Sequence, residues 1–366
     1  MMATPMPTTR TSDPDFLSAW IDRLPGRVAQ SLLGWLWLQI QRFRPPRTEL
    51  RPARIFEDAF LEGVNLPWFS CGNDFGVNAW HPEGGIASPG RIDQIRPVFE
   101  ALQREGITCL RWWLFADGRS GIRADATGRP TGLDHRVFPD LDLALELAAA
   151  HGLRIIPVCF DFLLCGPREM SGEVQLGGRR HWIRNREHWV ALENHVLKPL
   201  FKRYGSHPAI LAWDLFNEPE WAVCGMGWRE ASVSPRLMQA RLARMVRLAH
   251  RHGDRPVTVG LASARGLPLV RGIGLDFFQI HWYDRHDTSS PLDRSVVRLK
   301  LDRPLLLGEY PTRNSRRSQA EILELARRHG YCGALGWSLL AQDGCSGMEL
   351  AAPPSEGLPS DSLLLG

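Results

Sequence analysis

The chain has 366 residues, of which 44% are hydrophobic and 23% are charged, and its formal net charge at pH 7 is +4. This composition is ordinary for a soluble protein with a substantial core. The arginines that carry the positive charge are dispersed along the chain, which argues against a nucleic-acid-binding protein. The length fits one barrel of alternating strands and helices, which takes ~250 residues, plus extensions.

The cysteines and the start of the chain indicate the cellular compartment. There are seven cysteines, but none forms a Cys-x-x-Cys pair or a Cys/His cluster with metal-ligand spacing. We predict neither a disulfide framework nor a structural zinc site, and a reducing compartment is favoured. The first 25 residues lack the apolar core and cleavage site of a secretory signal, so a cytoplasmic or peripheral membrane protein is expected rather than a secreted one.

An amphipathic segment, residues 28–43, lies within a predicted N-terminal extension, residues 1–53. On a helix its apolar side chains share one broad face, which consists of Val28, Leu32, Trp35, Leu36, Ile40 and Phe43. The segment is too short to span a bilayer. Two interpretations remain open: an interfacial helix that lies on anionic lipid between flanking arginines, or a helix docked on the outer surface of the following domain.

From residue 54 onwards, short apolar runs alternate with amphipathic segments. The apolar runs predict buried strands at residues 62–68, 107–114, 153–160, 209–216, 256–260, 276–281, 305–309 and 332–338. The amphipathic segments predict helices at residues 92–105, 140–151, 186–204, 235–252 and 318–328. A long loop is expected at residues 115–137 and a glycine-rich loop after the third strand.

Eight strands separated by helices or loops predict an α/β fold in which a parallel sheet closes on itself, a (β/α)8 TIM barrel over residues 54–348. The remaining residues, 349–366, are rich in Pro, Ser and Gly and are expected to form a flexible tail.

Two of the predicted strands end in a glutamate. The apolar run from Ala209 stops at Asn217 and Glu218, and Pro219 prevents the strand from continuing. Another run ends at Glu309, between a glycine and Tyr310. The carboxyl ends of barrel strands are where such barrels place their chemistry. Paired carboxylates there are what glycoside hydrolysis requires.

These segments carry a family resemblance. Tyr204-Gly-Ser-His-Pro-Ala-Ile through Asn217-Glu218-Pro219, together with Gly308-Glu309-Tyr310, resemble the clan A glycoside hydrolases and are most like family 5, the cellulases and mannanases. The resemblance implies that Glu218 is the general acid and later the base, and that Glu309 is the nucleophile.

Further site residues follow from the ends of other strands. Arg111, at the end of the second strand, is the type of residue that lowers the pKa of a nucleophilic carboxyl. His281 and Tyr283 resemble the family's His-x-Tyr after strand six, in which the phenol hydrogen-bonds the nucleophile. Trp337, at the end of strand eight, resembles the family's platform under the sugar that is cleaved.

Aromatic residues suggest how a sugar would be held. The chain contains 14 tryptophans, and flat aromatic faces stack on sugar rings. With Trp337, we predict that Trp68, Trp113, Trp221 and Trp282 line one cleft. The chain departs from the family after strand three, where relatives commonly have a histidine and this sequence has Asp161. Two interpretations are open: Asp161 contacts a sugar hydroxyl in its place, or the chain belongs to a divergent branch of the clan.

The sequence therefore predicts a retaining β-glycosidase that acts on a β-glucan or β-mannan type of polysaccharide or oligosaccharide. Two alternatives are a transglycosylase, in which a sugar intercepts the glycosyl-enzyme intermediate, and a non-catalytic carbohydrate-binding or scaffold barrel of a polysaccharide-assembly system. Neither a metal nor an organic cofactor is required by any motif, and the oligomeric state is not predicted. The glutamate pair favours an enzyme.

Overall fold

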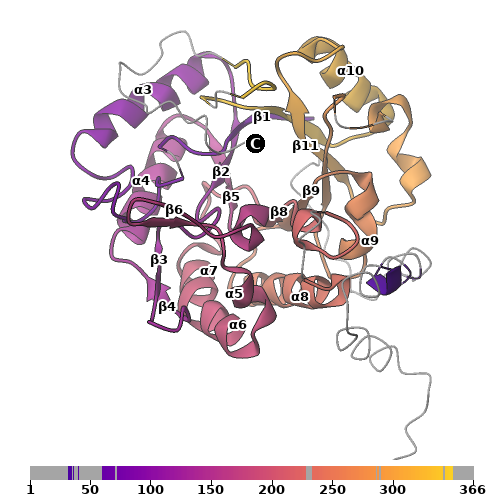
Figure 1. Cartoon of the computed structure of the whole chain (residues 1–366). Coiled ribbons are helices and arrows are strands. Elements are labelled where there is room, and N and C mark those ends of the chain that lie inside the picture. The colour runs from indigo at the N-terminus through magenta and orange to yellow at the C-terminus, as the bar shows by residue number, and fades with distance from the viewer. Residues whose placement is uncertain are drawn as a thin grey trace, which may run out of the picture.

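The barrel predicted from the sequence is confirmed. The computed structural model describes residues 32–34, 36, 40, 60–70, 72–227, 233–285, 287, 290–340 and 343–348. Eight parallel strands close into a barrel in the order β1-β12-β11-β10-β9-β8-β5-β2, and helices surround it (Figure 1). The strands are β1 (Leu61–Leu66), β2 (Cys109–Trp113), β5 (Arg154–Val158), β8 (Trp213–Asn217), β9 (Val257–Leu261), β10 (Phe278–His281), β11 (Leu305–Pro311) and β12 (Gly333–Trp337).

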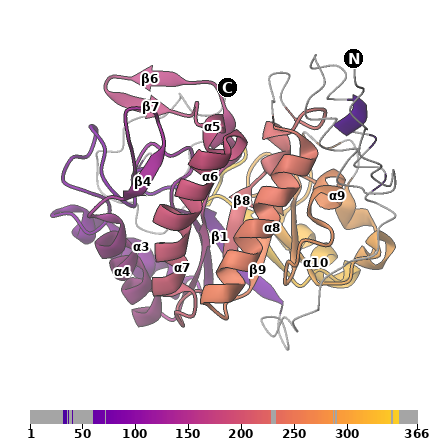
Figure 2. The ribbon, with the colours of Figure 1, turned by 90° about the horizontal axis from the view of Figure 1, so that it is seen from below.

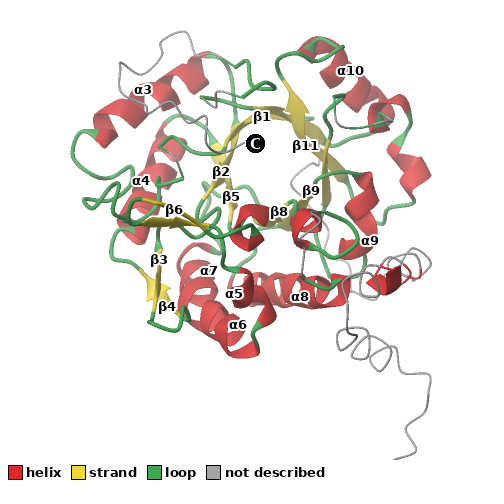
Figure 3. Cartoon of the chain, viewed as in Figure 1, coloured by secondary structure: helices red, strands yellow, loops and turns green. Residues whose placement is uncertain are grey.

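Helices form the outer layer of the barrel (Figure 3). The longer ones, close to the predicted positions, are α3 (Arg91–Arg104), α4 (Val137–Ala150), α8 (Pro235–His252) and α10 (Gln319–His329). The predicted helix 186–204 is built from α6 (Arg186–Leu192), a π-helical turn η3 (Glu193–Leu197) and α7 (Lys198–Tyr204). The fourth barrel strand begins at Trp213, later than the predicted 209, because Ala209–Ala212 pair with the neighbouring strand only through Ile210 and Ile155.

Local signals explain where helices begin and end. Helix α10 opens with a capping box, in which the Ser318 side chain accepts from the Glu321 backbone and the Glu321 side chain accepts from the Ser318 backbone. It ends at Gly330, whose φ of 88° lies in the left-handed region that favours glycine. Ser234 caps α8 in the same manner, by accepting from the Leu237 backbone.

Two segments predicted as loops contain short hairpins. Residues 115–137 form β3 (Ile122–Ala124) and β4 (Pro130–Leu133), and the third-strand loop forms β6 (Glu169–Ser171) and β7 (Val174–Leu176). The loop then continues into α5 (Arg180–Arg184). These strands are too short for a recognisable period-two pattern, which is why periodicity missed them. The β6–β7 hairpin lies at the top of the molecule as viewed in Figure 2.

The interior of the barrel is layered. Near the amino-terminal ends of the strands it is filled by an apolar cluster of Cys109, Ile156, Leu211, Ala212, Phe277, Leu306 and Leu335. Closer to the carboxyl ends of the strands, buried polar side chains point inward. They include Asn65, Arg111, Asp214, Thr258 and Gln279. The larger apolar core fills the space between the strands and the helices. The layers leave the carboxyl ends of the strands for polar and aromatic groups.

The predicted terminal regions lie largely outside the described residues. Residues 349–366 are not described, and of residues 1–53 only 32–34, 36 and 40 are, all of them helical. Within the described part of the chain, no helix has the length and apolar character needed to cross a bilayer.

Candidate active site

Both predicted catalytic glutamates lie at the carboxyl ends of barrel strands. Glu218 directly follows β8, and Glu309 lies within β11. The strand pairing shifts register next to each of them, between Asp214 and Asn217 on β8 and between Leu307 and Tyr310 on β11. Such bulges re-aim side chains at barrel rims. Glu218 itself has a φ of 47°, a left-handed conformation that is strained for a side-chain-bearing residue and recurs at functional sites.

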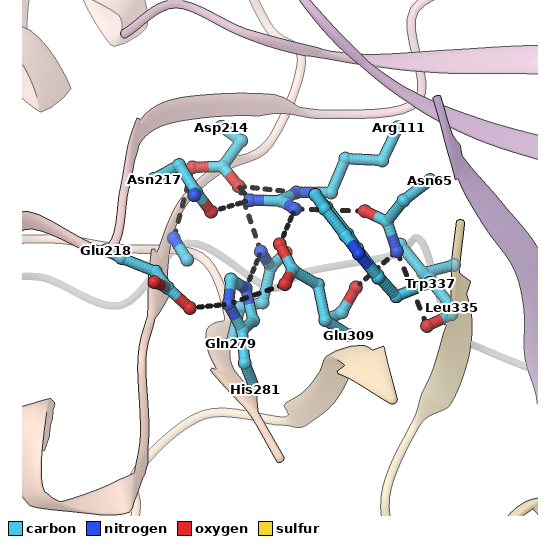
Figure 4. Close-up of polar contacts among 12 residues, drawn as sticks. Asn65, Arg111, Asp214, Asn217, Glu218, Gln279, His281, Glu309, Leu335 and Trp337 are labelled. Carbon is cyan, nitrogen blue, oxygen red and sulfur yellow. Dashed lines mark hydrogen bonds and ion pairs between the residues drawn. The ribbon is translucent and has the colours of Figure 1, made fainter. Parts of the chain in front are cut away.

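The two glutamates face each other across His281 (Figure 4). The Nδ1 atom of His281 lies 2.7 Å from Oε1 of Glu218 and 3.3 Å from Oε2 of Glu309. One oxygen of Glu218 and one of Glu309 lie within 4.8 Å of each other. This closest approach of two oxygen atoms is in keeping with the ~5–5.5 Å separation of carboxyl groups in retaining glycosidases rather than the ~6.5–9.5 Å of inverting ones.

Both oxygens of Glu309 accept strong hydrogen bonds. The Arg111 guanidinium donates to Oε1 at 2.7 Å, and the Tyr283 hydroxyl donates to Oε2 at 2.6 Å. Burial raises the pKa of the Glu309 carboxyl, whereas His281, Arg111 and Tyr283 act in the opposite direction. The bonds also fix the orientation of the carboxyl group, as a nucleophile needs.

Arg111 is the centre of a buried polar network. Its side chain is fully buried and pairs with Asp214 at 2.8 Å as well as with Glu309. It also donates to Oδ1 of Asn65 at 3.0 Å and to Oδ1 of Asn217 at 2.6 Å. Arg111 therefore lies against Glu309, and every N–H group of its planar guanidinium is used.

The surroundings of Glu218 differ from those of Glu309. Its Oε2 atom accepts a hydrogen bond of 2.7 Å from the indole N–H of Trp221, three residues later. The Trp221 ring is 38% exposed and packs beside the Phe162 ring, with centroids 6.2 Å apart. The Glu218 carboxyl is thus more open than the Glu309 carboxyl and borders an accessible aromatic surface.

Asp161 is buried at the end of β5, and its oxygens are occupied by protein groups. Oδ1 accepts from the Leu163 backbone at 2.9 Å, and Oδ2 accepts from Trp113 at 3.0 Å and from the Asn217 amide at 2.7 Å. Burial raises the pKa of Asp161 to about 7. The contacts orient Asn217, so that Asp161 acts on the site through its neighbour; direct contact with a sugar hydroxyl stays a prediction.

The predicted aromatic residues do not all gather at one place. Trp113 and Trp337 meet edge to face with centroids 5.7 Å apart, and the Arg111 guanidinium lies over the Trp113 ring. Trp68 is half-buried and is contacted by Arg119. Trp282 does not join them, because its ring is 2% exposed and packs in the main core. It follows His281 directly on the strand, so its side chain points to the opposite side.

Three buried residues of the network were not predicted as site residues: Asn65, Asp214 and Gln279. Each is a polar residue inside an otherwise apolar strand run, as in Asp276-Phe-Phe-Gln-Ile-His281. Gln279 precedes His281 by two positions, so the two side chains share one face of β10. That pattern is the sequence signal that could have identified it.

One group of three side chains among the described residues has the spacing of a metal site, and it consists of Glu218, His281 and Glu309. Its members already bind one another and Tyr283.

Comparisons with known proteins show what the chain is similar to. No protein-family model matches the chain. A mannan endo-1,4-beta-mannosidase of Mytilus edulis is 26% identical over 321 residues, covering 76% of this chain and 83% of that protein. A second, from Cryptopygus antarcticus, is 24% identical over 335 residues, covering 79% and 83%.

Solved structures share the fold. The endo-1,4-beta-mannanase of Eisenia fetida superposes with a TM-score of 0.67 at 22% identity, covering 79% of this chain and 87% of that one. The beta-mannanase of the blue mussel Mytilus edulis gives a TM-score of 0.63 at 22% identity, covering 76% and 86%. The sequence relatives and the barrel identify the chain as a glycoside hydrolase, and it is most similar to the clan A enzymes of glycoside hydrolase family 5.

Proposed function

We propose that this enzyme is a retaining β-glycosidase that hydrolyses β-1,4-linked mannan. The observation that carries the proposal is the approach of Glu218 and Glu309 to within 4.8 Å, which fits a double displacement through a covalent intermediate. The named mannan-cleaving relatives support mannan as the substrate over a β-glucan.

In the first step, a carboxylate oxygen of Glu309 bonds to the anomeric carbon while the bond from that carbon to the leaving oxygen breaks. Glu218 transfers its proton to the leaving oxygen at the same time. Arg111 and Tyr283 hold the Glu309 carboxylate in place for the attack. Their hydrogen bonds also make the carboxylate a better leaving group in the step that follows.

In the second step, Glu218 is ionised and takes a proton from a water molecule. The water oxygen bonds to the anomeric carbon as the bond to Glu309 breaks, and Glu218 regains its proton. The His281 and Trp221 N–H groups, both 2.7 Å from Glu218, stabilise its ionised form between the two steps.

A transglycosylase remains a second candidate because of one observation. The exposed Trp221 ring is tied to Glu218 and lies beside Phe162, which gives the leaving-group side of the site an apolar surface. A sugar stacked there would compete with water for the intermediate.

Activity on a panel of soluble β-mannans, β-glucans and aryl β-glycosides tests the substrate and the reaction together. We expect reducing ends to be released from mannan, with little release from glucan. Products longer than a defined mannooligosaccharide substrate would indicate transglycosylation. Turnover of glucan alone would contradict the proposed substrate.

We also propose peripheral contact of the N-terminal segment, residues 28–43, with an anionic membrane. Three of its described apolar residues are exposed, Leu32 by 64%, Leu36 by 49% and Ile40 by 54%. Gly34 faces the other way, because a Cβ placed on it would lie 2.9 Å from Pro235 at the start of α8. Gly34 thus lies against the barrel domain, while Leu32, Leu36 and Ile40, in a segment flanked in sequence by arginines, stay open to lipid.

A further inference from the structure

The amide of Gln279 lies between Asp214 and His281 inside the barrel (Figure 4). It is fully buried, and its Nε2 atom donates to Oδ2 of Asp214 at 2.9 Å. The same Nε2 atom lies 3.5 Å from Nε2 of His281. The flanking strands leave room for this side chain, because a Cβ on Gly260 would lie 2.6 Å from its Nε2, and one on Gly308 would lie 2.5 Å from its Cγ.

The orientation of the Gln279 amide is fixed by Asp214. That carboxylate is ion-paired with Arg111 and accepts from the Gln279 amide on the same oxygen. A flipped amide would set its own oxygen against the carboxylate, two acceptors with no proton between them. The NH2 group therefore stays between Asp214 and His281.

The N–H donor beside Nε2 affects the protonation state of the His281 ring. The 3.5 Å contact favours an Nε2 that accepts and carries no proton, with the single proton of the ring on Nδ1. Nδ1 faces Oε1 of Glu218 at 2.7 Å and Oε2 of Glu309 at 3.3 Å, both of which accept. A neutral ring with its proton on Nδ1 satisfies all of these contacts.

We propose that Gln279 is a positioning residue that keeps His281 neutral and so allows Glu218 to hold the proton it must donate. This inference rests on the proposed function of Glu218 as general acid. A doubly protonated His281 would form an ion pair with Glu218 and favour its ionised form before the substrate arrives. The neutral ring still donates one hydrogen bond, which stabilises Glu218 once its proton has been given away.

The other charged or titratable groups around His281 shift the pKa of its ring in opposite directions. Glu309 and Asp214 favour the protonated ring, and Arg111 disfavours it; the Tyr283 phenol binds Glu309 beyond it. Burial lowers the pKa of His281 to about 4, in agreement with the geometry.

Gln279→Glu reverses the proposed contact with little change in shape. A protonated carboxyl at this position would donate its O–H to Asp214 and turn its carbonyl oxygen to His281, and an ionised one would also present an acceptor. His281 should then gain a second proton. The alkaline limb of kcat/KM should move to lower pH by about one unit, and poor leaving groups should lose more rate than activated aryl groups. Gln279→Met places no carboxyl oxygen beside His281, so the alkaline limb of kcat/KM should move less in this variant.

Nitrogen-15 NMR of histidine-labelled protein reads the ring directly, with the His281 signals assigned from their loss in His281→Asn. The wild type should show an unprotonated Nε2 at neutral pH, and Gln279→Glu should show both nitrogens protonated. A protonated Nε2 in the wild type would overturn the inference. Because this measurement needs no turnover, a chain inactive on every glycoside would refute the proposed function without deciding the state of His281.

Thr258→Val is the matched control for a buried polar group in the same barrel interior. Thr258 is fully buried and donates to the Phe277 backbone at 3.0 Å. Its loss should lower the melting temperature without moving the pH profile. If Gln279→Glu behaved in the same way, with equal rate losses at every pH and for every leaving group, Gln279 would be structural only.

Discussion

Arg111 of β2 and Glu309 of β11 meet at 2.7 Å, although β1 and β12 separate their strands around the barrel. Both side chains are buried, so the contact crosses the barrel interior and is shielded from water. A cation in this position favours the ionised form of Glu309, whereas burial raises the pKa of that carboxyl.

Arg111→Met should therefore impair both activity and folding. Removal of the cation leaves Asp214 and Glu309 uncompensated, which should cost ~3–5 kcal/mol of unfolding free energy. The acidic limb of kcat/KM should move to higher pH, because the Glu309 pKa rises further. Arg111→Lys keeps the charge but not the planar geometry, so the acidic limb of kcat/KM should move less in this variant. An unmoved acidic limb in Arg111→Met would show that Arg111 does not tune the nucleophile.

The roles of the two glutamates can be separated by leaving group and by azide. Glu218→Ala should keep a measurable first step on an activated aryl glycoside, which departs with little proton assistance. Azide needs no general base and should restore its turnover as a β-glycosyl azide. Glu309→Ala lacks the covalent route, so activated substrates should not rescue it, and azide could give only the α-azide. Identical responses of the two variants, measured by product NMR, would contradict the assignment.

Asp161→Asn should slow catalysis with a smaller effect on KM. Asp161 accepts three N–H groups on its two oxygens, whereas an asparagine has a single acceptor oxygen, so either the Leu163 backbone or the Asn217 amide together with the Trp113 indole loses its partner. We expect kcat to fall ~10–100-fold. Asp125→Asn is the control, because Asp125 accepts comparable bonds from Thr127 and Arg129 in a surface turn. Equal kcat values for wild type and Asp161→Asn would refute the positioning of Asn217.

Glu220 should make stability depend on pH. Burial raises its pKa to about 8 from an ordinary value of 4.5, and the Glu218 charge adds to the rise. The folded state then holds the proton more tightly than the unfolded state, so the free energy of unfolding falls as pH rises between these two values.

Glu220→Gln removes this dependence. When the pH rises from about 5 to about 8, the free energy of unfolding should fall less in the variant than in the wild type. The difference should be about 1 kcal/mol or more. Urea unfolding at both pH values measures the difference. Glu146→Gln, at an exposed position on α4, should follow the wild type. A parallel pH dependence in Glu220→Gln would mean that Glu220 is ionised in the folded protein.

Charged substitutions test the membrane contact of the N-terminal segment. Leu32→Glu with Ile40→Glu should reduce co-sedimentation with anionic vesicles, because both side chains are exposed and apolar. Val297→Glu is the matched control, since Val297 is an exposed apolar residue, by 79%, in another part of the chain. Equal sedimentation of both proteins, or none by the wild type, would contradict the contact.

Local patterns in the sequence were sufficient to predict the barrel and to place the two glutamates at strand ends. Apolar runs of strand length, interrupted by amphipathic segments, predict buried parallel strands because each pattern reports the burial of its own segment. Asn217-Glu218-Pro219 marks a strand end because proline cannot continue the ladder. Side chains alternate between the two faces of an extended chain, so Trp282 should point away from the face that carries His281 and Tyr283. Its burial could therefore have been predicted from the sequence.

Only the tertiary structure decided which side chains meet. Arg111, Asp214 and Glu309 come from three different strands, and barrel closure with its register shifts brings them together. Asp161 reads in the sequence as a free carboxylate at a strand end, yet folding surrounds it with three N–H donors. A local pattern encodes how deeply a residue is buried and on which face it lies. Its partners across the barrel depend on the stagger of all eight strands, which no single segment specifies.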